Sequence, residues 1–252
     1  MPVEAKPLFR PDVLRPYIDQ FQLPERVENL RPKLNDWAEL ISSGRADTIK
    51  ETQLLPDFLT DFFYELLGYR GPAGGSDTYT ISREQLVEVG GKFADAVLGH
   101  FHLSSERYIA ALEGKGPKDP LERPFAGRKK SAVDQCYGYA INLPCDWIIV
   151  TSIRQTRLYY KGTDQHTYEL FETESLARDD RLLRRFLFLL GAERMVPESG
   201  ECHLYKLRAA SEKVGKELTK EYYIRYADIR QDIFEQLVAA NPKVSRQDLL
   251  AC

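Results

Sequence analysis

Two carboxylates and a lysine form a set whose residue types and spacing could do chemistry together: Asp95, Glu113 and Lys115. Glu113 and Lys115 end an apolar segment at 109–112, and both point to the same face because side chains alternate along a strand. Asp95 lies among apolar residues in the preceding segment. An antiparallel hairpin of the two segments would bring the carboxylates together, with roughly 4.5–5.5 Å between opposed Cβ atoms.

This set indicates metal-dependent chemistry on a phosphate. Two neighbouring carboxylates repel one another and are stabilised by a cation between them. Oxygen ligands with room for water suit Mg²⁺, for which Mn²⁺ can substitute. Bound Mg²⁺ stabilises charge on a phosphate and activates water, while Lys115 would position that water or stabilise developing charge. The simpler alternative is that Asp95 forms a surface ion pair with Lys92 or Lys115.

A basic segment at 115–130 follows these residues directly. It holds six basic and two acidic residues, a balance of +4 in a chain whose overall net charge is −3. Such a segment favours the phosphate backbone of a nucleic acid through counterion release. The alternative is a solvated loop without a ligand. The candidate DNA contacts are Lys118, Arg123, Arg128, Lys129 and Lys130.

The segment 131–143 is predicted to be a helix with two polar residues of interest, Gln135 and Tyr139. These residues are four apart, so they share one helix face, and either could reach a phosphate or orient a metal ligand. The apolar stripe is predicted on the opposite face. Its members are Val133, Cys136, Tyr137, Ala140 and Ile141.

In this order and spacing, the motifs resemble those of the PD-(D/E)XK nuclease superfamily. More narrowly, the chain is similar to the N-terminal nuclease region of single-chain restriction–methylation enzymes of type IIG/IIL, over about residues 48–195. The position before the first carboxylate is Ala94 rather than the Pro of the motif's name. The residues that carry the resemblance are Asp95, Glu113, Lys115, Gln135 and Tyr139.

The resemblance implies a role for each of these residues. Asp95 and Glu113 would be Mg²⁺ ligands, Lys115 the catalytic lysine, and Gln135 and Tyr139 supporting site residues. It also implies that Glu51, in the preceding predicted helix, contributes to the metal site.

The function implied is a Mg²⁺-dependent endonuclease domain of a restriction–modification enzyme, which hydrolyses phosphodiester bonds in double-stranded DNA. A second hypothesis is a catalytically silent nuclease-like DNA-docking module of a DNA methyltransferase system. The sequence contains no Asn-Pro-Pro-Tyr-type motif and no glycine-rich strand-to-helix turn for a methyl donor. The methyltransferase and target-recognition regions are therefore expected to be absent from this chain.

The elements that must position these residues follow from hydrophobic periodicity. We predict an α/β fold with a restriction-endonuclease-like core (helix, three-strand meander, helix, strand) and a helical C-terminal extension. The expected domains are an N-terminal helical segment at 1–47, a nuclease-like domain at 48–200 and the extension at 201–252. Helices are predicted at 25–41, 51–67, 131–143, 181–190 and 212–240, and strands at 79–89, 92–101, 107–115, 147–151, 157–160 and 167–171.

The last predicted helix carries an apolar stripe of its own. We expect this stripe to pack on the chain's own core; the alternative is that it docks a partner or an absent domain. Its members are Tyr223, Tyr226, Ala227, Ile233, Phe234 and Leu237.

Composition excludes several classes of protein. With 43% hydrophobic and 29% charged residues among 252, the chain is globular rather than disordered or fibrous. It has neither a bilayer-spanning apolar run of roughly 20 residues nor a signal peptide, which predicts a soluble cytoplasmic protein without membrane contact. Its four cysteines lack Cys-x-x-Cys spacing, so reduced thiols are expected. His100 and His102 could share a strand face, but without a third ligand nearby they do not indicate zinc.

Overall fold

The computed structural model describes residues 5–250 except 74–76, 88–91 and 103–104, and it leaves out the side chains of 84–87, 92–93, 248 and 250. The connection between the predicted strands at 79–89 and 92–101, Gly90 and Gly91, therefore lies outside the described residues. The chain divides into two compact units, Met1–Leu207 and Arg208–Cys252. The expected N-terminal segment at 1–47 shares a hydrophobic core with the rest of the first unit.

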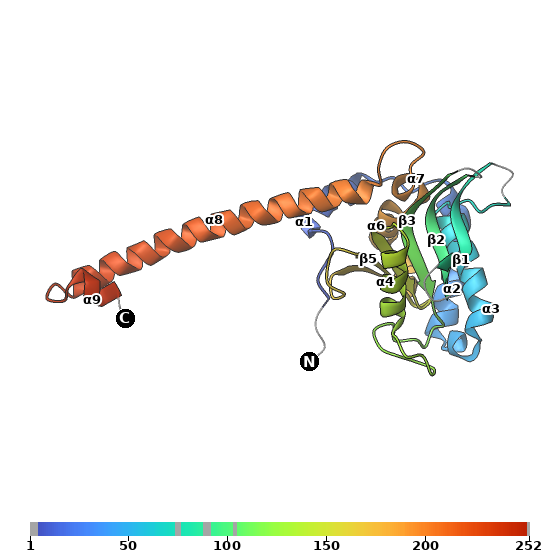
Figure 1. Ribbon diagram of the computed structural model, residues 1–252, viewed down its shortest axis with the longest axis horizontal. Helices are drawn as coiled ribbons and strands as arrows, with labels where there is room; N and C mark the ends of the chain where they lie inside the picture. The colour runs from blue at the N-terminus through green and yellow to red at the C-terminus, as the bar shows by residue number, and fades with distance from the viewer. Residues whose placement is uncertain (1–4, 74–76, 88–91, 103–104, 251–252) are drawn as a thin grey trace. The chain divides into compact units, whose positions relative to one another are not determined.

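A six-stranded mixed sheet forms the centre of the first unit (Figure 1). The strands follow one another in chain order across the sheet, and every neighbouring pair is antiparallel except β3 and β4, which are parallel. The predicted α/β class is confirmed, with each predicted strand present. The strands are β1 (Thr78–Val87), β2 (Lys92–His102), β3 (Ser105–Gly114), β4 (Trp147–Thr151), β5 (Gln155–Tyr160) and β6 (Tyr168–Glu172).

Helix α4 (Ala132–Asn142) connects the parallel strands β3 and β4 and packs on one face of the sheet. It begins where predicted because the Ser131 hydroxyl accepts a hydrogen bond from the Asp134 N–H at 2.9 Å, a typical N-cap. The prediction for its apolar face is partly wrong. Ile141 is 72% exposed, whereas Tyr139 is buried, because the face that meets the sheet follows Cys136 and Ala140 and turns Ile141 to solvent.

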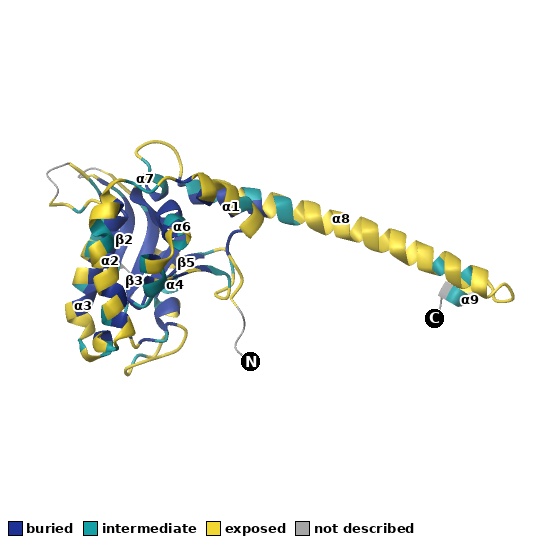
Figure 2. Ribbon diagram, turned by 180° about the vertical axis from the view of Figure 1, so that it is seen from behind, coloured by how far each residue is buried: buried dark blue, intermediate teal, exposed yellow. Residues whose placement is uncertain are grey.

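The opposite face of the sheet is covered by helices from both ends of the first unit. Phe58 and Phe62 stack at 4.3 Å between ring centroids, and Trp37 packs edge-on against Phe58 at 5.5 Å. In Figure 2 the central strands β2 and β3 are coloured mainly as buried. The helices that share this core are α1 (Pro11–Gln20), α2 (Arg26–Ser42), α3 (Glu51–Phe58), η2 (Leu59–Leu66) and α6 (Asp180–Leu190).

Two of these helices differ from the prediction. Helix α1 is an addition, and Pro11 is compatible with its first turn because proline lacks only an N–H that has no helical partner there. The predicted helix over 51–67 changes at Leu59 from α to π geometry, and Gly68, at φ +81°, ends it as expected. Short elements complete the unit: η1 (Arg45–Thr48), α5 (Thr173–Arg178) and α7 (Ala192–Met195).

Helix α8 (His203–Ala240) begins in the first unit, and the second unit contains its remainder and α9 (Arg246–Leu250). The apolar stripe of α8 is largely uncovered, with Tyr223 65%, Tyr226 55% and Ile233 54% exposed. Packing of the stripe on the chain's own core and docking of a partner therefore both stay predictions. Among the described residues, no helix combines the length and apolar character needed to cross a membrane.

Deleting 208–252 should leave the melting temperature of the first unit within a few degrees of the full chain. The reason is that the hydrophobic core of this unit includes no residue beyond Leu207. Deleting 196–252 should cost about 3 kcal/mol or more, because it removes the buried Cys202, Leu204 and Leu207. Thermal and urea unfolding check both. Equal losses from the two deletions would contradict the assignment of α8 beyond Leu207 to a separate unit.

Candidate active site

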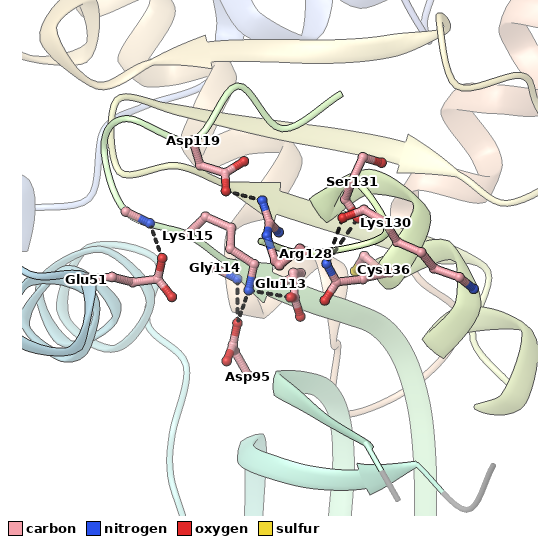
Figure 3. Close-up of polar contacts among 12 residues, drawn as sticks. Glu51, Asp95, Glu113, Gly114, Lys115, Asp119, Arg128, Lys130, Ser131 and Cys136 are labelled. Carbon is pink, nitrogen blue, oxygen red and sulfur yellow. Dashed lines mark hydrogen bonds and ion pairs between the residues drawn. The ribbon is translucent and has the colours of Figure 1, made fainter. Parts of the chain in front are cut away.

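The two predicted carboxylates lie on adjacent strands at the same end of the hairpin β2–β3 (Figure 3). Ala96 pairs with Leu112, and one residue further along the two strands come Asp95 and Glu113. Asp95 Oδ2 accepts a hydrogen bond from the Gly114 N–H at 2.8 Å, which fixes its carboxylate against the end of β3. The hairpin predicted from the sequence is therefore present and brings the carboxylates together.

Lys115 extends its ammonium toward both carboxylates. Its Nζ lies 2.5 Å from Glu113 Oε1 and 3.9 Å from Asp95 Oδ2. Its backbone N–H donates to the Thr151 carbonyl at 2.8 Å, which continues the β3–β4 pairing beyond Gly114. Only 12% of the Lys115 side chain is exposed, and its ammonium contacts both carboxylates. The simpler alternative of a surface ion pair with Asp95 therefore does not describe this contact.

Burial dominates the electrostatics of this cluster. The Glu113 side chain is 3% exposed, and burial together with the Asp95 charge raises its pKa to about 7, against the opposing effect of Lys115. Burial alone would lower the pKa of Lys115, but the Glu113 charge and hydrogen bond outweigh it and raise that pKa. Near neutral pH, Lys115 is therefore charged, while Glu113 exchanges between its neutral and ionised forms.

Helix α3 approaches β3 closely because glycine follows each of the two charged residues. A Cβ on Gly114 would lie 2.4 Å from Leu55 Cδ1, and one on Gly116 would lie 3.3 Å from Glu51 Cβ. Glu51, one helical turn before Leu55, accepts a hydrogen bond from the Gly116 N–H at 2.6 Å. The sequence Glu-Gly-Lys-Gly thus allows α3 to bring a third carboxylate next to Lys115.

The donor set of the cluster suits a hard divalent cation. Asp95 and Glu113 offer only oxygen atoms, and both already lie near a cationic group, the Lys115 ammonium. The third predicted ligand, Glu51, is instead engaged with the Gly116 N–H. In the part of the chain that the structure describes, no three His, Cys, Asp or Glu side chains converge as a metal-holding group. A cation here would be held by Asp95 and Glu113, with water as its remaining ligands.

The two predicted supporting residues on α4 occupy different positions. Gln135 Nε2 donates to the carbonyls of Lys130 and Ser131 at 3.3 and 3.2 Å, at the N-terminus of its own helix. Tyr139 lies on the buried face rather than the predicted polar face. Burial and the nearby carboxylates, Glu113 first, raise the pKa of Tyr139. Of the two residues, Tyr139 is therefore the one whose hydroxyl lies close enough to Glu113 and Asp95 to be affected by their charges.

The basic segment is partly neutralised by its own acidic residues. Arg128 forms an ion pair with the buried Asp119, and its Nε donates to the Phe125 carbonyl at 3.2 Å. Leu121 is fully buried beneath this segment despite a φ of +65°. The other predicted DNA contacts are exposed: Lys118, Arg123, Lys129 and Lys130.

Several residues near the site were not singled out from the sequence. Asp119 anchors Arg128, and the buried Arg157 on β5 pairs with Glu122 at 2.6 Å. Their signal was weak because an acidic residue in a basic segment contributes to the net charge without revealing its partner.

A cavity of about 310 Å³ opens beside Lys115. Its lining includes Asp47, Glu51, Lys118, Phe125 and Arg128.

The cysteines agree with the prediction of reduced thiols over the described range. Cys136, Cys145 and Cys202 are buried and form no disulfide, and Cys252 lies outside the description. Cys136 packs under the site on α4, where its thiol donates to the Ile149 carbonyl at 3.6 Å. Burial and then the Glu113 charge raise the pKa of this thiol, which makes it a packing residue and not a nucleophile.

The raised pKa of Glu113 predicts a pH-dependent stability that Glu113→Gln should remove. A neutral Glu113 favours the folded state, so its contribution is complete below the unfolded pKa of about 4.3 and is lost as pH rises through about 7. Between pH 5 and 8, without divalent cations, the parent should lose on the order of 2 kcal/mol relative to Glu113→Gln. Urea unfolding across this pH range measures the difference. A difference independent of pH would contradict it.

The close approach of α3 predicts opposite effects of alanine at two glycines. Gly114→Ala should destabilise the fold by about 1–3 kcal/mol, because the new Cβ overlaps the buried Leu55 side chain. Gly138→Ala, in helix α4, meets no atom within 4 Å and should stabilise by about 0.5–1 kcal/mol. Chemical denaturation of both variants tests this. A neutral Gly114→Ala would show that α3 does not depend on this contact.

Comparisons with protein-family models, curated proteins and solved structures found no match for this chain. The chemistry of the site must therefore be argued from its own geometry. That geometry is a buried carboxylate beside a second, half-buried one, with an ammonium between them and a cavity alongside.

Proposed function

We propose that this chain is a Mg²⁺-dependent endonuclease domain that hydrolyses phosphodiester bonds in double-stranded DNA. The observation that carries the proposal is the convergence of Asp95, Glu113 and Lys115 at the end of the β2–β3 hairpin. Carboxylates that share a cation, with an ammonium at hydrogen-bond distance, match the needs of phosphoryl chemistry.

The arrangement of elements around the site supports a PD-(D/E)XK-type assignment, the restriction-endonuclease-like core expected from the resemblance. The meander β1–β2–β3 supplies the two carboxylates, and α4 leads to β4, which is parallel to β3. Helix α3 packs against β3 from the opposite face and presents Glu51. The positions of Asp95 and Glu113 on adjacent strands and of Glu51 on the helix beside them support this assignment.

The proposed reaction is hydrolysis of a phosphodiester. The oxygen of a water molecule bonds to phosphorus while one ester P–O bond breaks, and a proton from the water reaches the leaving oxygen through solvent, which gives a phosphate monoester and an alcohol. Asp95 and Glu113 in their ionised forms would hold Mg²⁺, which would supply charge stabilisation to the phosphate. Lys115 would donate its N–H groups to the attacking water or to a non-bridging phosphate oxygen. Because its pKa is raised, Lys115 carries a positive charge and stabilises developing negative charge rather than acting as the base.

The exposed cations of the basic segment would bind the DNA backbone. Lys118, Lys129 and Lys130 are exposed on the chain that follows Lys115, and Arg123 is exposed between them. Their contribution should depend on salt, because each phosphate contact releases counterions. Arg128, held by Asp119, would shape this segment rather than contribute a free charge.

Membership of a restriction–modification system is part of the proposal and is supported by the resemblance of the motifs. Under it, a methyltransferase and target-recognition region outside this chain would supply sequence specificity.

Substitution at the site should abolish cleavage without abolishing DNA binding. Glu113→Ala and Lys115→Ala should each reduce cutting of a supercoiled plasmid in Mg²⁺ or Mn²⁺ by about 10²-fold or more. The double variant Lys129→Ala/Lys130→Ala should instead weaken binding and flatten its salt dependence. Cleavage rates, DNA affinities at several salt concentrations and melting temperatures measure these effects.

Two results would contradict the proposal. Site variants that cut as well as the parent would show that Asp95, Glu113 and Lys115 are not the site. Salt-dependent binding without metal-dependent cutting by the parent would favour the silent DNA-docking module instead.

A further inference from the structure

Arg154, in the turn between β4 and β5, contacts two segments that are distant in the sequence. Its Nε donates to the Pro117 carbonyl at 3.1 Å, and its Nη2 lies 2.8 Å from Asp47 Oδ1. Both side chains of this ion pair are about one-third exposed. One guanidinium thus joins the β4–β5 turn, the chain that follows Lys115 and the segment that precedes α3.

The turn that carries Arg154 is held in a strained conformation. Ile153 has a φ of +69°, which is unfavourable for a β-branched residue. Its N–H donates to the Thr151 hydroxyl at 3.1 Å, and its carbonyl accepts from the Thr173 hydroxyl. The Arg154 carbonyl accepts from the Thr173 N–H at 2.9 Å. Such strain persists only where the surroundings determine it, and here they fix the direction from which Arg154 leaves the sheet.

The two contacts of Arg154 lie next to the two flanks of the candidate site. Pro117 is two residues after Lys115, and Asp47 lies in η1, four residues before Glu51 at the start of α3. The two flanks meet again where the Gly116 N–H donates to Glu51. The chain after Lys115 and the start of α3 are therefore joined twice: directly by the Gly116–Glu51 hydrogen bond, and through Arg154 by its contacts with Pro117 and Asp47. Asp47 and Pro117 also line the cavity beside Lys115.

We infer that Arg154 is a positioning residue for the metal site: by bonding Pro117 and Asp47 together, it holds the chain after Lys115 against the start of α3 and so fixes Lys115 and Glu113, which lies two residues before it. This inference rests on the proposed function, because it assigns Arg154 a task at the proposed site. Arg154 itself touches neither a reacting atom nor a metal ligand. Its effect is transmitted through the backbone of 115–117 and the start of α3.

The alternative is that the Arg154–Asp47 pair is an ordinary ion pair that contributes only to stability. The chain offers a matched control in Arg31, whose Nη1 lies 2.9 Å from Asp180 Oδ1 and whose side chain is 32% exposed. Arg31 also joins segments far apart in the sequence, α2 and the start of α6, and neither Arg31 nor Asp180 lines the cavity beside Lys115. A purely structural role predicts the same behaviour for Arg154→Ala and Arg31→Ala.

The experiment measures Mn²⁺ binding to the full chain by electron paramagnetic resonance of the free ion, together with the melting temperature. Arg154→Ala should raise the Mn²⁺ dissociation constant by about 10-fold, the lower end of the effect of residues that orient metal ligands, because Arg154 acts on Glu113 only through the backbone that follows it. Arg31→Ala should lower the melting temperature comparably and leave Mn²⁺ affinity within about twofold of the parent, because it lies outside the shell that orients the ligands.

Two milder variants keep the inference testable if Arg154→Ala does not fold. Arg154→Lys retains the charge but loses the fork that reaches both acceptors, so it should give an intermediate loss of Mn²⁺ affinity. Asp47→Asn should weaken Mn²⁺ binding in the same direction. The double variant Asp47→Asn/Arg154→Lys should lose less Mn²⁺ affinity than the sum of the two single losses, because the two residues act through one contact.

The outcomes separate this inference from the proposed function. A parent that binds Mn²⁺ and cuts DNA, with variants of Arg154 and Asp47 that retain full Mn²⁺ affinity, would overturn the inference alone. A parent with no Mn²⁺ binding would overturn both. Weaker Mn²⁺ binding in the Arg154 variants, with Arg31→Ala unaffected, supports the positioning role.

Discussion

The architecture around the site depends on a carboxylate, Glu113, that is almost fully buried at the end of a central strand. An ionised carboxyl there is costly because it has lost water and faces a second carboxylate on the adjacent strand. Lys115 offsets part of this cost with an ammonium at 2.5 Å, and the remainder appears as a pKa near 7. A group in this state gains from a divalent cation, and this gain connects the packing of the sheet with the proposed chemistry.

The surrounding elements serve to hold this cluster in a shielded position. On one face, α4 packs Cys136 and Tyr139 against the sheet, and Leu121 of the basic segment at 115–130 belongs to the same buried cluster. On the other face, α3 can approach only because Gly114 and Gly116 lack side chains. Both helices pack on the sheet through apolar side chains. The free energy that offsets the burial of the charged groups therefore comes from apolar burial around them. This division allows the site to combine an unfavourable charge arrangement with a stable fold.

Local patterns predicted much of the fold and part of the site. The segments predicted as strands became β1 to β6, and α4 begins close to the predicted start of its helix, because strand alternation and helix starts depend on residues close in the chain. The positions of Tyr139 and Ile141 were predicted incorrectly. For these residues, the direction of an apolar face depends on which element packs against it, and one sequence does not specify that partner.

The sequence by itself determined that Asp95, Glu113 and Lys115 would meet, since a hairpin and the alternation of side chains are sufficient to place them on one face. Only the tertiary structure decided that Glu113 is buried, that Glu51 bonds to Gly116, and that Arg128 is neutralised by Asp119. It also joined Arg154 to Asp47, across more than a hundred residues. The physical reason is that burial and long-range ion pairs arise from packing between elements, whereas strand alternation and hairpin register arise within them.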